Sequence, residues 1–392
     1  MRILILTHNY PRFAGDPAGA YVARLAAAAA GAGHQVQVLA PHVAGTGEEE
    51  RDPSGSAVRR FRYAPEWLER VGYRGDVRSR TLFSPLTLIL LPFFLAAFRR
   101  AARQLVQDFR PDVVHAHWWF PGGWIASGLG VPYVITAHGS DARLLDRGPW
   151  FRRLAGPVFR GAARVTAASR FLAGDLERRL PAGSTVVVTP MPVEIDRFGA
   201  AFNTPRVVPP RILYAGNLVP GKGVDVLLRA AAELRQRSGP FRVRVLGEGP
   251  ELPSLHALAA ELGIAGDVDW APFVPQDRMP AEYGAATITV LPSRGQAEGL
   301  GLTLVEALLA GSAVVGTPAG GIPEVVQDGD TGLLARDGDA SHLAAQIERL
   351  LVDAGLRRRL IAAGAARMRE IYAPAAAASR FLDLYRSVAK AA

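Results

Sequence analysis

Short apolar runs rich in β-branched residues alternate with longer helix-like segments along the chain, and this alternation occurs twice. Continuous apolar strands separated by helices are typical of a parallel sheet that is covered on both faces. A chain of 392 residues also exceeds the ~250–300 residues at which a single core stops growing. We therefore predict an α/β protein with two Rossmann-like domains. The predicted strands are Arg2–Thr7, Gln35–Ala40, Val113–His117, Tyr133–Ala137, Arg164–Ala167, Thr185–Thr189, Arg211–Ala215, Arg242–Leu246, Val268–Trp270, Ile288–Leu291 and Ala313–Gly316.

Prolines mark the boundary between the two rounds of alternation. The chain reads Pro-Met-Pro from Pro190, and three more prolines lie between Phe202 and Pro210. Such a stretch continues neither a helix nor a central strand. We predict an N-terminal domain over residues 1–200 and a C-terminal domain over 206–374. Residues 375–392 form an apolar-faced helix that is expected to return to the N-terminal domain.

The composition excludes several classes of protein. The chain has no cysteine, which rules out a disulfide framework, a thiol nucleophile and a thiolate zinc site. Only four apolar residues follow Arg2, too few for a signal peptide. Leu82–Phe98 reaches the minimum length of a spanning helix, but Pro85 and Pro92 favour a core helix or one on a bilayer surface. A cytoplasmic protein is expected, either free or peripheral at the inner face of the plasma membrane.

The positive charge lies in the first half. The net charge is +9, and residues 1–200 hold 25 Lys and Arg against 16 Asp and Glu. Between Arg59 and Arg80, seven arginines alternate with aromatic residues. This region, extended to Phe98, is interpreted either as a seat for anionic lipid headgroups or as a solvated arginine-rich loop. No nucleic-acid-binding motif accompanies the charge, so nucleic acid is not an expected partner.

The most informative motif runs from Pro292 to Gly311. A predicted strand ends just before it, and a helix begins near Leu302. The free amides and the positive dipole end of such a helix form a seat for a diphosphate. Glycines allow the backbone to approach the ligand closely. A carboxylate in the loop, Glu298, suits sugar hydroxyls, and Glu306 one turn into the helix suits a ribose hydroxyl pair.

Two further strand ends carry candidate ligand-binding residues. Lys222 lies in the loop after Arg211–Ala215, where a compact cation suits a diphosphate. His138 directly follows Tyr133–Ala137, and an imidazole there can bond a sugar hydroxyl or a developing charge. Because ligands of open parallel sheets bind at the carboxyl ends of the strands, both residues are expected at a cleft between the domains.

These motifs together resemble family 4 of the retaining glycosyltransferases, whose fold is called GT-B. The resemblance covers essentially the whole chain and rests on the Glu-x7-Glu pair, the Gly-Lys-Gly loop around Lys222 and the His-Gly-Ser-Asp sequence from His138. It implies that His138 contacts the transferred sugar and that Glu298 binds the donor sugar, the two catalytic candidates. The residues implied in donor binding are Gly19, Gly216, Asn217, Lys222, Val274, Glu298, Gly299, Leu300, Gly301 and Glu306.

The chain departs from the family pattern at two places. Asn217 stands where the family usually has an arginine that contacts the diphosphate, so one charge is missing. Arg294 is a candidate to compensate. Gly19 is followed by Ala20 where the family often has two glycines, which weakens the expected phosphate contact by Gly19.

The resemblance implies transfer of a hexose-type sugar from a UDP or GDP sugar to a hydroxyl of a glycan or lipid-linked precursor of cell-envelope polysaccharide, as in teichuronic-acid-type enzymes. No cofactor and no metal ion are expected, because lysine and helix dipoles replace the metal that Asp-x-Asp pairs would otherwise bind. Two alternatives are a sugar-nucleotide 2-epimerase of the same fold and a non-catalytic nucleotide-sugar-binding protein. Neither half begins with Gly-x-Gly-x-x-Gly, which argues against a nicotinamide dehydrogenase.

Two histidines lie on the predicted strand Val113–His117, and three tryptophans follow it in sequence. We expect His115 and His117, which alternate along this strand, to point to opposite faces of the sheet. Trp118, Trp119 and Trp124 are interpreted as packing residues rather than as the lining of an acceptor groove.

Overall fold

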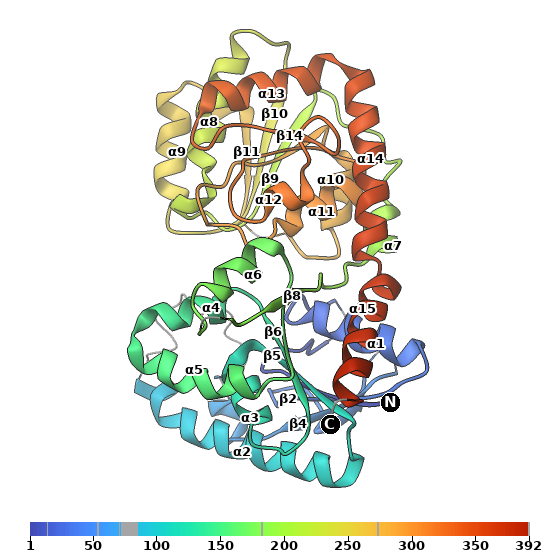
Figure 1. The fold of residues 1–392 in the computed structure, drawn as a ribbon. Coiled ribbons are helices and arrows are strands. Elements are labelled where there is room, and N and C mark those ends of the chain that lie inside the picture. Colours follow the sequence, from blue (N-terminus) through green and yellow to red (C-terminus); the bar gives the residue numbers. More distant parts are fainter. Residues whose placement is uncertain are drawn as a thin grey trace. The chain divides into compact units, whose positions relative to one another are not determined.

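The computed structural model describes residues 1–13, 15–52, 55–69, 71, 85–181, 183–272 and 274–390. Its contacts divide the chain into an N-terminal unit, Met1–Val193 with Pro374–Ala392, and a C-terminal unit, Glu194–Ala373 (Figure 1). The division falls before helix α7 (Ile195–Gly199), whereas the sequence placed it at residue 200. Phe198 of α7 is buried and its ring lies 6.0 Å from that of Tyr283, which attaches α7 to the C-terminal unit.

The N-terminal unit contains an eight-stranded sheet of order β3-β4-β2-β1-β5-β6-β7-β8. All neighbours are parallel except β3 and β4, which are antiparallel. The predicted parallel sheet is confirmed, but β3 and β4 were missed, because β3 consists of charged residues and β4 contains two adjacent arginines. The strands are β1 (Arg2–Leu6), β2 (Gln35–Pro41), β3 (Glu49–Arg51), β4 (Ala57–Phe61), β5 (Val113–His117), β6 (Tyr133–Ala137), β7 (Arg164–Ala167) and β8 (Val186–Val188).

Helices cover both faces of this sheet (Figure 1). Phe94 and Phe98 of α2 and Val158 of α5 enter one core, and Leu25 of α1 and Phe381 of α15 enter the other. The predicted return of the terminal helix to the N-terminal domain is confirmed, since α15 packs on α1. The helices are α1 (Ala20–Gly31), α2 (Pro85–Phe109), α3 (Trp124–Ala126), α4 (Ser140–Leu144), α5 (Pro149–Gly161), α6 (Arg170–Glu177) and α15 (Pro374–Ala389).

The C-terminal unit contains a wholly parallel six-stranded sheet of order β11-β10-β9-β12-β13-β14. Its strands are β9 (Arg211–Ala215), β10 (Arg242–Leu246), β11 (Val268–Ala271), β12 (Ile288–Leu291), β13 (Ala313–Gly316) and β14 (Leu333–Leu334). Besides α7, its helices are α8 (Val224–Arg235), α9 (Leu252–Glu261), α10 (Met279–Ala285), α11 (Leu302–Leu309), α12 (Ile322–Val325), α13 (Ala340–Val352) and α14 (Ala354–Tyr372). The sequence predicted every strand except the two-residue β14.

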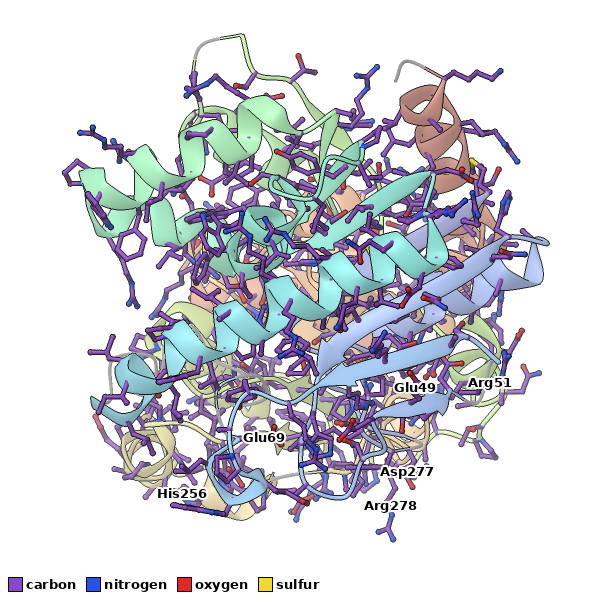
Figure 2. The ribbon with its side chains drawn as sticks, turned by 90° about the horizontal axis from the view of Figure 1, so that it is seen from below. Glu49, Arg51, Glu69, His256, Asp277 and Arg278 are labelled. Carbon is purple, nitrogen blue, oxygen red and sulfur yellow. The ribbon has the colours of Figure 1, made fainter. Side chains whose placement is uncertain are left out.

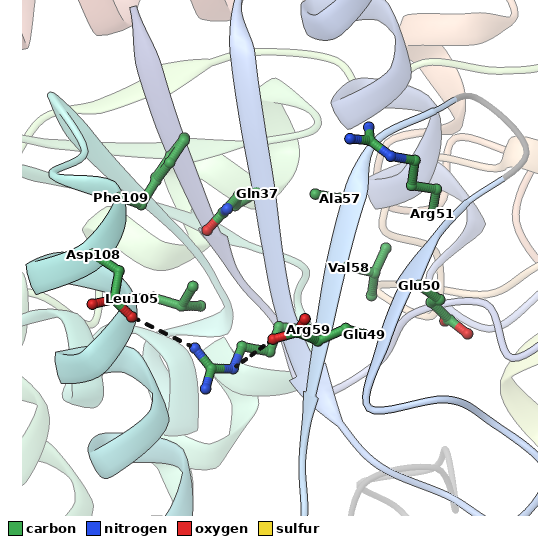
Figure 3. A pocket seen from close by; sticks show the side chains of 10 residues that line it. All are labelled: Gln37, Glu49, Glu50, Arg51, Ala57, Val58, Arg59, Leu105, Asp108 and Phe109. Atoms are coloured by element: carbon green, nitrogen blue, oxygen red, sulfur yellow. Dashed lines mark ion pairs between the residues drawn. The ribbon is translucent and has the colours of Figure 1, made fainter.

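The arginines at the start of the Arg59–Arg80 segment do not form an open basic loop. Arg59 pairs with Glu49 and with Asp108 in a groove of about 580 Å³ between β3, β4 and α2 (Figure 3). Arg60 is 2% exposed and bonds Glu50. Figure 2 shows Glu49 with Arg51 on the outer strand β3. Glutamates of β3 thus pair with Arg59 and Arg60, and a contact of this segment with lipid headgroups stays a prediction. Arg70, Arg74, Arg78 and Arg80 lie outside the described residues.

Helix α2 has 25 residues and contains Pro92. Among the residues that the structure describes, no helix is both long enough and apolar enough to cross a bilayer.

Candidate functional site

Two loops at the carboxyl ends of β9 and β12 meet in the C-terminal unit. Gly223 precedes α8 with φ 68°, and a Cβ there would collide with the carbonyl oxygen of Pro292. The amide of Arg294 donates to the carbonyl oxygen of Gly221 at 2.9 Å. The start of α8 thus lies directly against the loop that leads into α11.

The start of α11 lies at the same edge of the sheet. Gly301 precedes it with φ 87°, a left-handed conformation that favours glycine. The hydroxyl of Thr303 donates to the carbonyl oxygen of Ala215, the last residue of β9, at 3.3 Å. The amino ends of α8 and α11 therefore converge, which concentrates free amides and positive dipole ends in one place.

Lys222 and Glu298 form an ion pair between these helix starts. Their side chains are 18% and 12% exposed, so the pair is shielded yet reachable. The hydroxyl of Ser293 donates to the same Glu298 oxygen at 3.4 Å. The structure brings together two predicted site residues that are 76 positions apart in sequence.

Glu306 of α11 is held by a residue that sequence reasoning missed. The hydroxyl of Tyr283, which is 2% exposed, donates to Glu306 at 3.1 Å. Burial first, and the charge of Glu306 second, raise the pKa of Tyr283, so the phenol stays a donor. No local signal marks Tyr283, because it lies on α10 and reaches Glu306 only through the packing of α10 against α11.

Gly320 and Gly321 hold the loop that contains Glu298 through backbone hydrogen bonds. The amide of Gly320 donates to the carbonyl oxygen of Gly295 at 2.9 Å, and the amide of Gly321 donates to that of Glu298 at 3.2 Å. A Cβ at Gly320, whose φ is 55°, would collide with the carbonyl group of Glu298. Gly320 and Gly321 therefore set the position of the predicted sugar-binding carboxylate.

Asn217 supplies no charge at the position where the family pattern has an arginine. Its side chain is exposed, and its carbonyl oxygen accepts from Tyr214 at 2.9 Å. Arg294 pairs with Asp225 at 2.7 Å. Compensation by Arg294 for the missing charge stays a prediction.

The remaining predicted donor residues line the loops around these groups. Gly216 follows β9 beside the Tyr214 ring, Gly299 and Leu300 continue the loop from Glu298, and Leu300 is buried. Val274 is half-buried after β11, and its neighbour Phe273 lies outside the described residues. Their contacts with the donor stay predictions.

The Asp-x-Asp pairs have partners within the fold. Asp269 pairs with Arg242, Asp337 accepts from the amide of Gly295, and Asp339 caps α13. These carboxylates stabilise turns and strands. That the reaction needs no metal ion stays a prediction.

His138 lies in an aromatic pocket of the N-terminal unit. Its ring centroid is 4.4 Å from that of Trp118 and 4.9 Å from that of Tyr21. Its backbone amide donates to the buried carboxylate of Asp141 at 2.9 Å. Burial foremost, then the neighbouring histidines, lower the pKa of His138 to about 3, so the imidazole is neutral near pH 7.

The expectation that His115 and His117 point to opposite faces is wrong. Residues two apart on a strand share a face, and the two ring centroids are 4.2 Å apart. His117 bonds His138 at 3.0 Å between Nδ1 and Nε2. Trp118 is 6% and Trp119 1% exposed, which supports their predicted packing role.

Gly19 opens α1 with φ 64°. A Cβ there would collide with the carbonyl oxygen of Asn9, so this glycine is required by the close approach of two backbone segments. A phosphate contact by Gly19 stays a prediction.

Comparison with known proteins places these features in a family. The family model described as "Glycosyltransferase Family 4" matches residues 18–197, and that described as "Glycosyl transferases group 1" matches residues 201–367. The chain belongs to glycosyltransferase family 4.

Its relatives include two proteins called D-inositol 3-phosphate glycosyltransferase. The protein of Streptomyces scabiei is 35% identical over 278 residues, which cover 63% of this chain and 62% of the relative. That of Frankia alni is 33% identical over 292 residues, 67% of this chain and 71% of the relative. The match thus spans about three fifths of the length of the first relative.

Solved structures show the same fold. Sucrose-phosphate synthase from Thermosynechococcus elongatus matches with a TM-score of 0.78 at 21% identity, over 100% of both chains. The Anabaena protein HepE, in complex with UDP-glucose, matches with a TM-score of 0.70 at 19% identity, over 99% of this chain and 100% of that one. The fold is GT-B.

Proposed function

We propose that this protein transfers a hexose-type sugar, with retention of anomeric configuration, from a nucleotide-diphosphate sugar to an acceptor hydroxyl. The observation that carries the proposal is the Lys222–Glu298 pair between the converging starts of α8 and α11. A cation and two helix amino ends at one point suit a diphosphate. The adjacent carboxylate suits hydroxyls of the attached sugar.

Each side chain of the candidate site then has a role in the proposed transfer. Lys222 would turn from Glu298 to the diphosphate and neutralise charge that grows as the sugar departs. Glu306, oriented by Tyr283, would accept from the ribose hydroxyls. His138 would donate to or accept from the transferred sugar as a neutral imidazole. The departing phosphate would serve as base on the same face of the sugar, so the reaction needs neither a carboxylate nucleophile nor a metal ion.

The donor is proposed to be a UDP or GDP sugar. HepE, which shares the fold, was solved in complex with UDP-glucose. A thermal-shift screen of sugar nucleotides tests this point, because a bound donor raises Tm with the logarithm of its concentration over Kd. UDP-glucose and GDP-mannose at equal concentration, with and without EDTA, separate the base preference from any need for metal.

The acceptor is proposed to be a glycan or lipid-linked precursor of cell-envelope polysaccharide. The relatives from Streptomyces and Frankia, called D-inositol 3-phosphate glycosyltransferases, favour a second candidate, a small phosphorylated polyol. Competition between inositol 3-phosphate and a lipid-linked saccharide for one labelled donor decides between the two. NMR of the product's anomeric proton shows whether configuration is retained.

A peripheral contact with an anionic bilayer is also proposed, for a protein working in the cytoplasm. Leu88, Ile89 and Phe93 of α2 are 51%, 63% and 61% exposed, and two exposed arginines, Arg99 and Arg100, follow on the same helix. Apolar side chains beside basic ones suit a headgroup boundary. Phe93→Ser should reduce sedimentation with phosphatidylglycerol vesicles, whereas Val352→Ser, at a 74% exposed site of the C-terminal unit, should not.

The decisive activity test is Glu298→Gln, which keeps the size of the side chain and removes its charge. We expect turnover to fall at least 100-fold, the order of loss for one preorganised transition-state contact. Glu261→Gln, at an exposed site on α9, is the matched control. Unchanged turnover in Glu298→Gln would contradict the proposal.

Product analysis separates the two alternatives. An epimer formed from the donor without any acceptor would identify a 2-epimerase. Donor binding without turnover for any acceptor would instead indicate a non-catalytic binding protein.

A further inference from the structure

We propose that His117 is a positioning residue that sets the tautomer of His138, so that His138 presents its Nδ1–H to the ligand. The inference rests on the proposed role of His138 at the transferred sugar. It concerns a side chain that makes no ligand contact itself, because His117 is 0% exposed. The effect of His117 would therefore pass entirely through the His138 ring.

The geometry of the two rings defines the contact. Nδ1 of His117 lies 3.0 Å from Nε2 of His138, and the rings are stacked at 23° with centroids 5.3 Å apart. A hydrogen bond at this distance requires one nitrogen to carry the proton and the other to accept. The bond occupies Nε2 of His138, so Nδ1 is the ring nitrogen that a ligand can use.

Burial keeps both rings neutral. Desolvation is the largest cause of the lowered pKa of His117 and of His138, and neighbouring histidines lower both further. Two neutral imidazoles carry one proton each, so only two arrangements of the shared bond exist. Either His117 donates from Nδ1, or His138 donates from Nε2.

The other nitrogen of His117 decides between these arrangements. Its Nε2 is buried and has no hydrogen-bond partner among the described residues. If His138 donated, His117 would carry its proton on Nε2, leaving an orphaned N–H in the core. A buried donor without a partner is rarer and costlier than a buried acceptor without one. His117 therefore donates, and His138 carries its proton on Nδ1.

The position of His117 is supported by a fixed neighbour. The ring of His115, centroid 4.2 Å away, is held on both nitrogens: Nδ1 lies 2.6 Å from the hydroxyl of Tyr385 on α15, and Nε2 lies 2.7 Å from that of Thr136. The ring of Trp118 also contacts that of His138, with centroids 4.4 Å apart. His117 of β5 thus sets the tautomer of His138, and Tyr385 of α15 holds the neighbouring His115 ring in place.

The tautomer has a chemical consequence. An Nδ1–H group is a donor, which suits a sugar oxygen or a phosphate oxygen that gains charge during transfer. The opposite tautomer would present a lone pair and repel such an oxygen. A fixed donor also costs no reorganisation when the charge develops.

The test is two-bond ¹H–¹⁵N correlation NMR on protein labelled at its 8 histidines, with His138→Ala to assign the His138 signals. We expect the Nδ1–H pattern for His138 in the unsubstituted protein. In His117→Phe the signal should shift toward the Nε2–H pattern. Turnover should fall about tenfold, as for one lost hydrogen bond in the transition state, with little change in KM for the donor.

Tyr385→Phe is the matched control, because it removes a hydroxyl from the same cluster without touching His138. It should leave the His138 pattern unchanged. An Nε2–H pattern in the unsubstituted protein overturns the proposal, even where His117→Phe does not fold. A pattern that persists in His117→Phe overturns it as well. If His138→Ala keeps full activity while the tautomer is as expected, the proposed role of His138 fails and the positioning by His117 stands.

Discussion

The candidate sites of the two units consist of different kinds of chemical group. The C-terminal unit uses charges and helix starts: Lys222, Glu298 and the amino ends of α8 and α11. The N-terminal unit uses neutral rings, with His138 against Trp118 and Tyr21 and bonded to His117. The half of the chain that is neutral overall thus places opposite charges at one point, whereas the basic half places buried, uncharged imidazoles at its candidate site.

Acid should destabilise the N-terminal unit far more than the C-terminal one. His115 and His117 are both 0% exposed, and burial lowers the pKa of His115 to about 3 and that of His117 well below its usual value. Below pH 6.5 the unfolded chain binds protons at these sites and the folded chain does not. Each pH unit below that value therefore removes about 1.4 kcal/mol per histidine from the free energy of unfolding, or about 3 kcal/mol for the pair.

Urea unfolding at pH 7 and pH 5.5 measures the effect. Five of the 6 tryptophans lie in the N-terminal unit, so Trp270→Phe makes fluorescence report that unit alone. His256→Gln, at an exposed histidine of the C-terminal unit, should leave the pH dependence unchanged. An N-terminal unit that keeps its full free energy of unfolding between pH 7 and pH 5.5 would contradict the prediction.

Gly320→Ala should abolish most activity, because the added methyl group would displace the backbone of the loop that carries Glu298. Its Cβ would displace the carbonyl group of Glu298, and its φ of 55° adds strain. We expect turnover to fall about 100-fold, since misplacement by 1 Å costs that much. Gly338→Ala has a comparable φ of 70° but meets nothing within 4 Å, so it separates steric displacement from strain. Equal losses in the two variants would show that strain alone is responsible.

The difference between the two candidate sites also explains which of their residues could be predicted from the sequence. Lys222, Glu298 and Glu306 each lie in a loop or helix start next to a strand, and short-range pattern is enough to find them. The neighbours of His138 come from separate segments, so only the folded chain shows the bond to His117. The pairing of Arg59 and Arg60 with glutamates of β3 was missed for the same reason, since it depends on an antiparallel contact between two short, polar strands.

Tyr283→Phe should weaken the donor site without altering its charge. The variant removes the hydroxyl that donates to Glu306 at 3.1 Å and leaves the ring packed. We expect KM for the nucleotide sugar to rise about fivefold, as for one neutral hydrogen bond, with turnover nearly unchanged. Tyr214→Phe is the control, because its hydroxyl bonds the carbonyl oxygen of Asn217 rather than a carboxylate. Loss of turnover with constant KM in Tyr283→Phe would place Glu306 at the reacting sugar instead of the ribose.

Asn217→Arg should strengthen donor binding, because it supplies the charge that this site lacks. Asn217 is exposed beside the start of α8, and Arg294 is occupied by Asp225. An added guanidinium at this exposed position, near the proposed diphosphate, should lower the Kd for the donor about threefold to fivefold, and high salt should reduce the gain. Asn203→Arg adds the same net charge at another exposed position of the C-terminal unit. If both variants improve binding equally, the gain comes from the overall charge; if only Asn217→Arg does, the C-terminal unit binds its anion through charges placed at the helix starts.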